Sequence, residues 1–365
     1  ALEFWRSLLG IKGVSTMLAK SLPKTGLSPV MAKAGLRVAR EGGRNEPDLV
    51  MALTRGADLE SAGLGLTDAE MKEIAVRAAR DGNAARGETV FRRKDISCVS
   101  CHAIGGAGGK VGPDLTSIGA SAPVDYLIES VFYPNRKIKE GYHSILIETK
   151  DGEELSGILV RENSEQLILR NATGAEVSVP KNNIKTRTLG NSLMPSGLVD
   201  SLTSAQQLDL FRFLSELGKP GPFDASKGNV ARSWKLFPQT VDIAQFGDDG
   251  ILKIKLSDHQ WLTAFSLVDG RLVKGELSGA LKSVKGRFPL SVFAAAQLQI
   301  AANGTVHLQL TGAANSPVWI DGKPANPDLK TELSAGLHTI IIKLDSQKLP
   351  ESLRLESSDG TFVAN

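Results

Sequence analysis

The sequence predicts a multidomain α+β protein: a helical N-terminal segment, an all-α core with an inserted small β-sheet or barrel, and a C-terminal all-β sandwich. Three observations predict this class. Apolar residues recur at helical spacing over residues 1–79, strict alternation replaces that spacing at about 141–190, and short alternating runs separated by turns follow from 225 to 365. A chain of 365 residues has room for two or three domains.

The composition is that of an ordinary globular protein, with 41% apolar and 23% charged residues. We expect no transmembrane segment, because no run of eighteen apolar residues occurs. The net charge of +3 is too small to predict nucleic acid as a partner. The first five residues, ALEFW, lack the pattern of a signal peptide, so we expect a mature or truncated chain.

The N-terminal segment, residues 1–79, is expected to form short amphipathic helices separated by Gly, Pro and Asn. The expected helices are 2–9, 13–21, 29–40, 47–55 and 68–80. The stretch Val30–Arg40 resembles one helix of a HEAT-like pair. Such pairs bury their apolar faces only against stacked neighbours, so the segment is either the end of a longer repeat array or a helical lead-in to the next domain.

The two cysteines of the chain are Cys98 and Cys101, and His102 follows directly. Cys-x-x-Cys-His is the attachment signal of c-type haem, in which two thiols bind one porphyrin edge and the histidine binds the iron. A thiol redox pair would need a βαβ pattern around it, and a zinc site would need further ligands. We therefore expect one covalently attached haem c, with its iron bound by His102.

The second axial ligand is expected to be Met194. It is the one methionine that follows the haem motif, and it lies in a loop, Asn191–Pro195, before the last helix of the core. A thioether on a loop suits the sixth position of haem iron. His143 is the competing ligand, and a buried core methionine is the alternative role for Met194.

The glycine-rich stretch Gly105–Lys110 is not a phosphate-binding loop. A Walker-type loop ending at Lys110 would need glycine where Ile104 stands and Ser or Thr where Val111 stands. The glycines instead allow the backbone to lie close to the haem. We expect a carbonyl near Pro113 to accept a hydrogen bond from His102 and fix the orientation of its ring.

Five segments together resemble a class I cytochrome c. They are Asn83–Phe91, Cys98–His102, Gly112–Leu115, Leu193–Pro195 and Gln207–Leu214. The closer resemblance, over about residues 80–218, is to the Planctomycete/Verrucomicrobium-type c-haem domain, in which a β-insert separates Cys-x-x-Cys-His from the distal methionine. In that family the haem domain often follows HEAT-like repeats.

This resemblance implies a haem domain over residues 80–220 with its β-insert at about 141–190. Gly87 and Phe91 would lie on an N-terminal helix that crosses the C-terminal helix, with Phe211 on the opposing face. The implied haem contacts are Cys98, Cys101, His102, Pro113, Leu115 and Met194. Within the insert, alternation predicts strands at 144–148, 155–160, 166–170 and 176–179, which accounts for the long separation of His102 and Met194.

The C-terminal domain, residues 225–365, is expected to be a β-sandwich. Expected strands include 251–256, 305–310, 317–320 and 338–344. The stretches Ser316–Lys323 and Leu333–Ile340 resemble jelly-roll domains of carbohydrate-associated extracellular proteins, which implies a carbohydrate or protein ligand. We expect Trp234, Trp261 and Trp319 to lie in the core.

These expectations combine into periplasmic electron transfer by an iron with His/Met ligation, serving a redox partner protein or a fused dehydrogenase. Covalent haem attachment of this kind takes place outside the bacterial cytoplasm, which predicts a periplasmic or otherwise extracytoplasmic location. An iron with both axial positions filled has no site for substrate, so we expect no enzymatic activity. The alternatives are a haem enzyme of peroxidase or oxidase type with an open distal site, and a haem-bearing carbohydrate- or protein-binding module.

Overall fold

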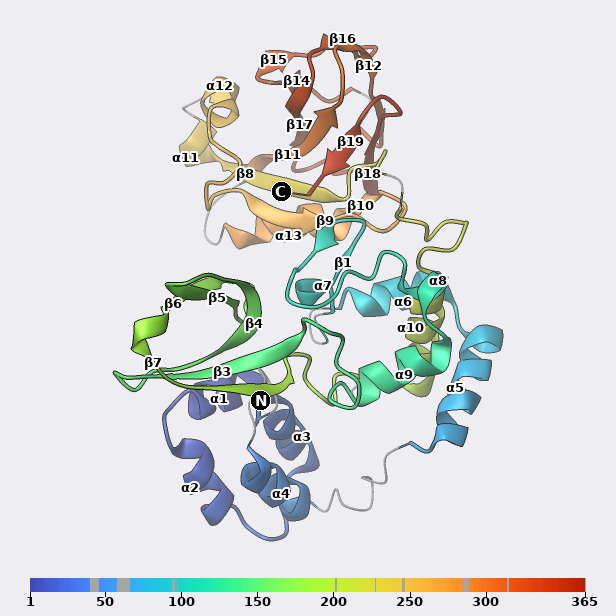
Figure 1. Ribbon diagram of the computed structural model, residues 1–365. Coiled ribbons are helices and arrows are strands. Elements are labelled where there is room, and N and C mark those ends of the chain that lie inside the picture. Colours follow the sequence, from blue (N-terminus) through green and yellow to red (C-terminus); the bar gives the residue numbers. More distant parts are fainter. Residues whose placement is uncertain are drawn as a thin grey trace. The chain divides into compact units, whose positions relative to one another are not determined.

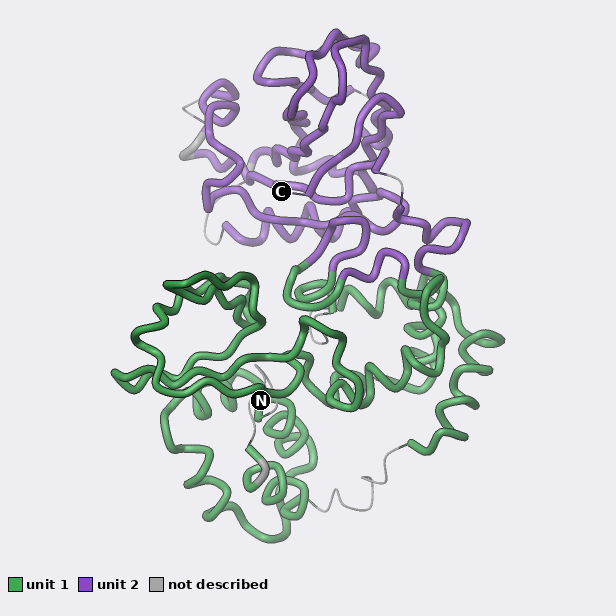
Figure 2. Tube along the Cα trace, in the orientation of Figure 1, with its two compact units in different colours: residues 1–102, 109–113, 118–216 green, residues 103–108, 114–117, 217–365 purple. Residues whose placement is uncertain are grey.

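The computed structural model contains both helices and β-sheets, which confirms the mixed α and β character predicted from the sequence (Figure 1). It describes residues 1–39, 46–57, 66–93, 96, 98–200, 202–226, 228–244, 247–284, 289–313 and 315–364. The chain forms two compact units (Figure 2). Unit 1 comprises residues 1–102, 109–113 and 118–216, and unit 2 comprises residues 103–108, 114–117 and 217–365. The finer division into 1–79, 80–220 and 225–365 stays a prediction.

Unit 1 begins with four short helices that share one apolar core. They are α1 (Leu2–Leu9), α2 (Val14–Ser21), α3 (Pro29–Ala39) and α4 (Pro47–Gly56). Trp5 lies in this core, and its indole Nε1 donates a hydrogen bond to the Met31 carbonyl at 2.9 Å. A Cβ at Gly35 would lie 2.7 Å from the Trp5 ring, so only glycine lets α3 approach α1 so closely. Helices this short are stabilised by such packing rather than by intrinsic propensity.

The remaining helices of unit 1 are α5 (Asp68–Asp81), α6 (Ala84–Phe91), α7 (Cys98–Cys101), α8 (Ile118–Ser121), α9 (Val124–Phe132) and α10 (Ser204–Glu216). Thr67 caps α5 in a reciprocal capping box with Glu70. Thr203 and Gln206 form the same arrangement at the start of α10. Thr203 is therefore the residue that caps α10.

Helices α6 and α10 cross at Gly87. A Cβ at this position would lie 1.9 Å from the Asp209 carbonyl oxygen, so the two backbones are in direct contact. The ring of Phe91 packs on Phe213, with centroids 5.6 Å apart. Phe211 instead packs on Phe132 of α9 at 6.0 Å. The crossing therefore agrees with the sequence-based expectation, but the ring that faces Phe91 is that of Phe213.

A five-stranded antiparallel sheet separates α9 from α10 in the sequence, and its strands curl around one core (Figure 1). Its strands are β3 (His143–Thr149), β4 (Glu154–Glu162), β5 (Gln166–Arg170), β6 (Glu176–Pro180) and β7 (Ile184–Ser192). They are ordered β6-β5-β4-β3-β7, and a 3-10 turn at Lys181–Asn183 joins β6 to β7. The core side chains are Ile145, Ile147, Leu167, Leu169 and Val179. Alternating residues predicted the first four strands, and the fifth ends two residues before Met194.

Unit 2 contains a seven-stranded sheet, a three-stranded sheet and two short two-stranded ladders. The seven-stranded sheet consists of β8 (Ser233–Thr240), β9 (Leu262–Phe265), β11 (Pro289–Ile300), β14 (Val318–Ile320), β15 (Lys323–Pro324), β17 (Gly336–Asp345) and β19 (Thr361–Val363). The three-stranded sheet consists of β10 (Leu272–Val273), β18 (Ser352–Glu356) and β13 (Gln309–Thr311). The ladders pair β1 (Ala103–Ile104) with β2 (Ala107–Gly108), and β12 (Gly304–His307) with β16 (Lys330–Leu333). The seven- and three-stranded sheets contribute to one core, which holds Leu298, Ile340 and Leu353.

Unit 2 also contains helices, so the expectation of an all-β region is wrong in part. The helices are α11 (Val241–Ala244), α12 (Gly247–Leu252) and α13 (Lys274–Ser283). The expected strand 251–256 is instead the end of α12 followed by turns. Asp248 and Asp249 stand in the first turn of α12, where carboxylates favour a helix, and Ile251 is buried beside Phe237. Tertiary packing of one isoleucine thus outweighs the alternating pattern.

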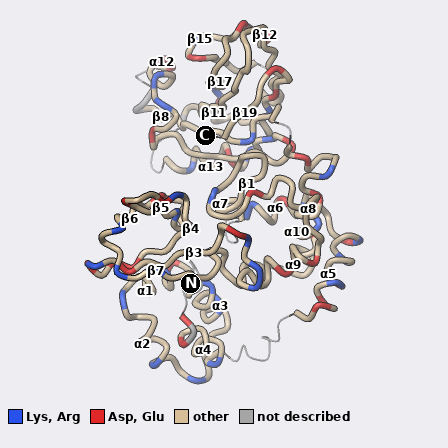
Figure 3. The backbone as a smooth tube through the Cα atoms, in the orientation of Figure 1, with Lys and Arg blue, Asp and Glu red and all other residues tan. Residues whose placement is uncertain are grey.

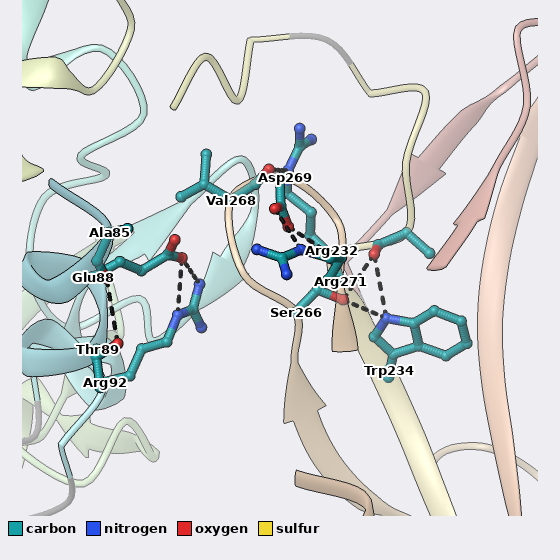
Figure 4. Close-up of polar contacts among 11 residues, drawn as sticks. Ala85, Glu88, Thr89, Arg92, Arg232, Trp234, Ser266, Val268, Asp269 and Arg271 are labelled. Atoms are coloured by element: carbon teal, nitrogen blue, oxygen red, sulfur yellow. Dashed lines mark hydrogen bonds and ion pairs between the residues drawn. The ribbon is translucent and has the colours of Figure 1, made fainter. Parts of the chain in front are cut away.

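The tryptophans of unit 2 belong largely to its interior. Trp234 and Trp261 are buried, and the half-buried Trp319 stacks on Phe293. The Trp234 indole donates to the Ser266 hydroxyl at 2.7 Å (Figure 4). Because the rings of Trp234 and Trp261 are buried, neither presents a face for stacking on a sugar.

Charged residues of both signs are distributed through both units (Figure 3). In unit 1, the guanidinium of Arg92, which directly follows α6, donates twice to the carboxylate of Glu88 in that helix, at 2.8 and 3.0 Å (Figure 4).

Within the described residues, no helix has the length and apolar character needed to cross a bilayer.

Candidate haem site

The Cys-x-x-Cys-His motif forms one helical turn, α7, with His102 at its end. The His102 amide donates to the Cys98 carbonyl at 2.9 Å, which continues the turn through the histidine. Residues three apart on a helix share one face, so Cys98 and Cys101 lie on the same side of the turn. Both thiols are partly buried. This arrangement can attach two adjacent positions of one planar ring.

Burial raises the pKa of the Cys98 thiol to about 12, with a further contribution from neighbouring Cys101. It also raises the pKa of the Cys101 thiol. Reactive dithiols of redox enzymes have lowered pKa values, because the thiolate is the nucleophile. The protein environment therefore does not favour a thiol–disulfide redox pair.

The loop Gly109–Pro113 lies directly against the α7 turn. The Gly109 amide donates to the Val99 carbonyl at 2.9 Å, and the Gly112 amide donates to the Cys101 carbonyl at 2.7 Å. A Cβ at Gly109 would lie 1.8 Å from the Ser100 carbonyl oxygen. A Cβ at Gly112 would lie 2.4 Å from Cε1 of the His102 ring. These two glycines are required by the close approach of backbone to the motif.

His102 Nδ1 donates a hydrogen bond to the Pro113 carbonyl oxygen at 2.8 Å. A carbonyl oxygen only accepts, so Nδ1 carries the hydrogen, and in neutral imidazole the lone pair then belongs to Nε2. This is the tautomer that an iron ligand requires, and the hydrogen bond to Pro113 fixes the ring orientation. The hydrogen bond expected from the sequence is therefore present, and the donor set fits a haem iron.

Met194 is brought close to the motif by an apolar cluster. Leu193, Val111 and Ile158 are buried together, with Cys101 and Tyr142 packed against them. Since adjacent Cα atoms are about 3.8 Å apart, the Leu193 position brings the backbone of Met194 near the same cluster.

The loop before Met194 is fixed by two further hydrogen bonds. The Met194 amide donates to Ser192 Oγ at 3.1 Å, and the Ser192 amide donates to Asn135 Oδ1 at 2.9 Å. The Met194 side chain is itself half-buried. The loop therefore starts from a fixed point at the end of β7.

The other predicted site residues lie as follows. His143 is exposed at the start of β3, opposite Ser192 in the sheet register. Leu115 belongs to the stretch Asp114–Ser117 of unit 2, and its amide donates to the Ala103 carbonyl at 2.8 Å.

Three residues that contact the motif or its loop were not identified from the sequence: Tyr142, Ile158 and Arg170. Tyr142 and Ile158 belong to the cluster beside Cys101, and Arg170 reaches the loop from β5. Alternation marks Ile158 and Arg170 as strand residues, but it carries no signal for the long-range partner of either.

Comparison with protein-family models finds no match, and no curated protein is significantly similar to the chain. Within the described ranges, no three His, Cys, Asp or Glu side chains gather as they would around a single metal ion.

Proposed function

We propose that this protein transfers electrons through one c-type haem, attached at Cys98 and Cys101 and ligated by His102 and Met194. The observation that carries this proposal is the hydrogen bond from His102 Nδ1 to the Pro113 carbonyl, at the end of a turn that holds both cysteines. That bond selects the imidazole tautomer needed by iron, which a surface histidine does not require.

Each residue of the site has a separate role in this proposal. Cys98 and Cys101 would hold the ring, His102 would supply Nε2 to the iron, and the Pro113 carbonyl would orient the imidazole. Gly112 allows the loop to lie against the ring of His102, since a side chain there would displace it. The haem, when bound, supplies an iron that alternates between the ferrous and ferric states.

Met194 is proposed to fill the remaining axial position. The cluster of Leu193, Val111 and Cys101 supports this role, because it brings the loop beside the motif. Two protein ligands leave the iron no open position, so the proposed role is electron transfer rather than catalysis. A partner or fused dehydrogenase would then be the electron donor or acceptor.

The finer fold and the location follow from the same proposal. We assign residues 80–220 to a class I-like cytochrome c core with a β-insert, the first 79 residues to HEAT-like helices, and residues 225–365 to a sandwich. The crossing of α6 and α10 at Gly87 supports the cytochrome assignment. A covalently attached haem implies maturation outside the bacterial cytoplasm, and hence a periplasmic or other extracytoplasmic location.

The intact mass of the purified protein tests this proposal. After expression in a bacterium with a c-haem attachment system, the mass should exceed that of the polypeptide by one haem and persist in denaturant. Cys98→Ser with Cys101→Ser should abolish the increase, whereas Ser100→Ala should leave it unchanged. A wild-type protein that matures at the polypeptide mass alone contradicts the proposal.

A further inference from the structure

Arg170 connects the inserted sheet to the loop that holds the axial histidine. It is the last residue of β5, and its Nη1 donates a hydrogen bond to the Lys110 carbonyl at 2.9 Å. Lys110 stands three residues before Pro113 in the same loop. The contact therefore ties the loop to β5, in addition to the hydrogen bonds that tie it to the α7 turn.

The guanidinium of Arg170 is itself held in place. Glu176 lies directly across from Arg170 in the β5–β6 register, and its carboxylate accepts from Nη2 at 2.8 Å. The Arg170 side chain is 23% exposed, so solvent only partly competes for these bonds. Arg161 approaches the same Glu176 carboxylate at 3.7 Å, but its side chain is 68% exposed.

Apolar contacts connect the same sheet to the loop at a second point. Val111 of the loop packs with Ile158 of β4 and with Leu193, which follows β7. The sheet thus contacts the loop at Val111 and continues into the segment that holds Leu193 and Met194. A group on this sheet can influence the geometry of both proposed axial ligands.

We infer that Arg170 is a positioning residue for His102, acting through the Lys110 carbonyl to hold Pro113 at hydrogen-bonding distance from Nδ1. This inference rests on the proposed function. A firm hydrogen bond at Nδ1 raises the basicity of a ligating imidazole, which stabilises the ferric state. Loss of the Arg170 contact should loosen the loop, weaken that bond and raise the reduction potential.

The charge of Arg170 acts in the opposite direction and can be separated from the positioning effect. Removing a nearby positive charge stabilises the ferric state and lowers the potential. Arg161→Gln removes the same charge beside the same carboxylate without touching the loop. It is therefore the matched control for Arg170→Gln.

Two measurements on the haem-loaded protein test the inference. In Arg170→Gln, the Gly112 amide, which donates to Cys101, should exchange with solvent about tenfold faster, and the reduction potential should rise. In Arg161→Gln, the exchange rate should stay unchanged and the potential should stay or fall. Where Arg170→Gln does not fold, Glu176→Gln is the second variant, and its readout is exchange at Gly112, which should also become faster, because loss of a negative charge raises the potential by itself.

An unchanged or lowered potential in haem-loaded Arg170→Gln overturns the inference, even where exchange at Gly112 is faster. That result would make Arg170 a structural residue of the loop only. A wild-type chain that acquires no haem is a different result, because it contradicts the proposed function itself. The two failures are therefore distinguished by the mass of the wild-type protein.

Discussion

His338 in unit 2 has a hydrogen-bond acceptor at each ring nitrogen. Asp321 Oδ2 lies 2.6 Å from Nδ1, and the Ser334 carbonyl oxygen lies 2.8 Å from Nε2. Since both partners accept, the doubly protonated imidazolium satisfies the site best. Burial by itself lowers the pKa of His338, but the hydrogen bonds to Asp321 and Ser334, with the charge of Asp321, raise it overall.

A raised pKa in the folded state predicts a specific pH dependence of stability. The contribution of His338 should be fully present below about pH 6.5, the unfolded pKa, and be lost as the pH rises through the higher folded pKa. Asp321→Asn should lower stability by on the order of 1 kcal/mol in acid, because the pair is partly exposed. Asparagine tolerates the positive φ of 51° at this position.

Urea unfolding of both proteins across this pH range measures the effect. The difference between wild type and Asp321→Asn should be largest at pH 5 to 6 and should shrink in alkali. A difference that grows with rising pH would show that the imidazolium is not the stabilising form.

At the scale of elements, the crossing of α6 and α10 depends on the absence of a side chain at Gly87. A Cβ there would meet the Asp209 carbonyl at 1.9 Å and Cβ of Phe213 at 2.7 Å. Gly87→Ala should therefore separate the helices and cost at least about 2 kcal/mol of stability. Gly279→Ala is the control, since α13 has open space at that position and alanine favours a helix by up to about 1 kcal/mol.

Denaturant unfolding followed by far-ultraviolet circular dichroism compares the two variants. The midpoint of Gly87→Ala should fall, whereas that of Gly279→Ala should stay or rise. Equal shifts in the two variants would mean that the crossing does not require glycine.

The sequence predicts elements well where one face of a strand or helix is buried regularly. Strand β5 was predicted at its observed bounds, 166–170, because a short apolar run stands between clear turns. The stretch 251–256 alternates, yet Ile251 lies in the last turn of a helix and is buried beside Phe237 and Trp261. Phe213, rather than Phe211, faces Phe91, since the exact helix rotation depends on the crossing at Gly87.

For the whole molecule, the haem motif can be recognised from the sequence, whereas the surroundings of the proposed site cannot. Cys98, Cys101 and His102 are adjacent in the chain, so their chemistry can be inferred without knowledge of the fold. The contact from Arg170 to Lys110 and the packing of Leu193 with Cys101 join distant segments. No local pattern encodes such pairs, because they depend on the register and curl of the inserted sheet.

At the level of the whole protein, an electron carrier and an enzyme would differ in the sixth position of the proposed haem iron. An iron held by both His102 and Met194 would exchange electrons with a partner and bind no substrate. An iron held by His102 alone would have an open position, as in enzymes of peroxidase or oxidase type. The occupant of that position would therefore decide the function.

The absorption spectrum of the ferric protein tests this claim most directly. The wild type should be low-spin and six-coordinate, with a methionine-to-iron charge-transfer band that is lost in Met194→Ala. Met71→Leu, which alters a buried methionine of α5 by a near-isosteric change, should keep the band. A five-coordinate, high-spin wild type, or a band that persists in Met194→Ala, would contradict the account.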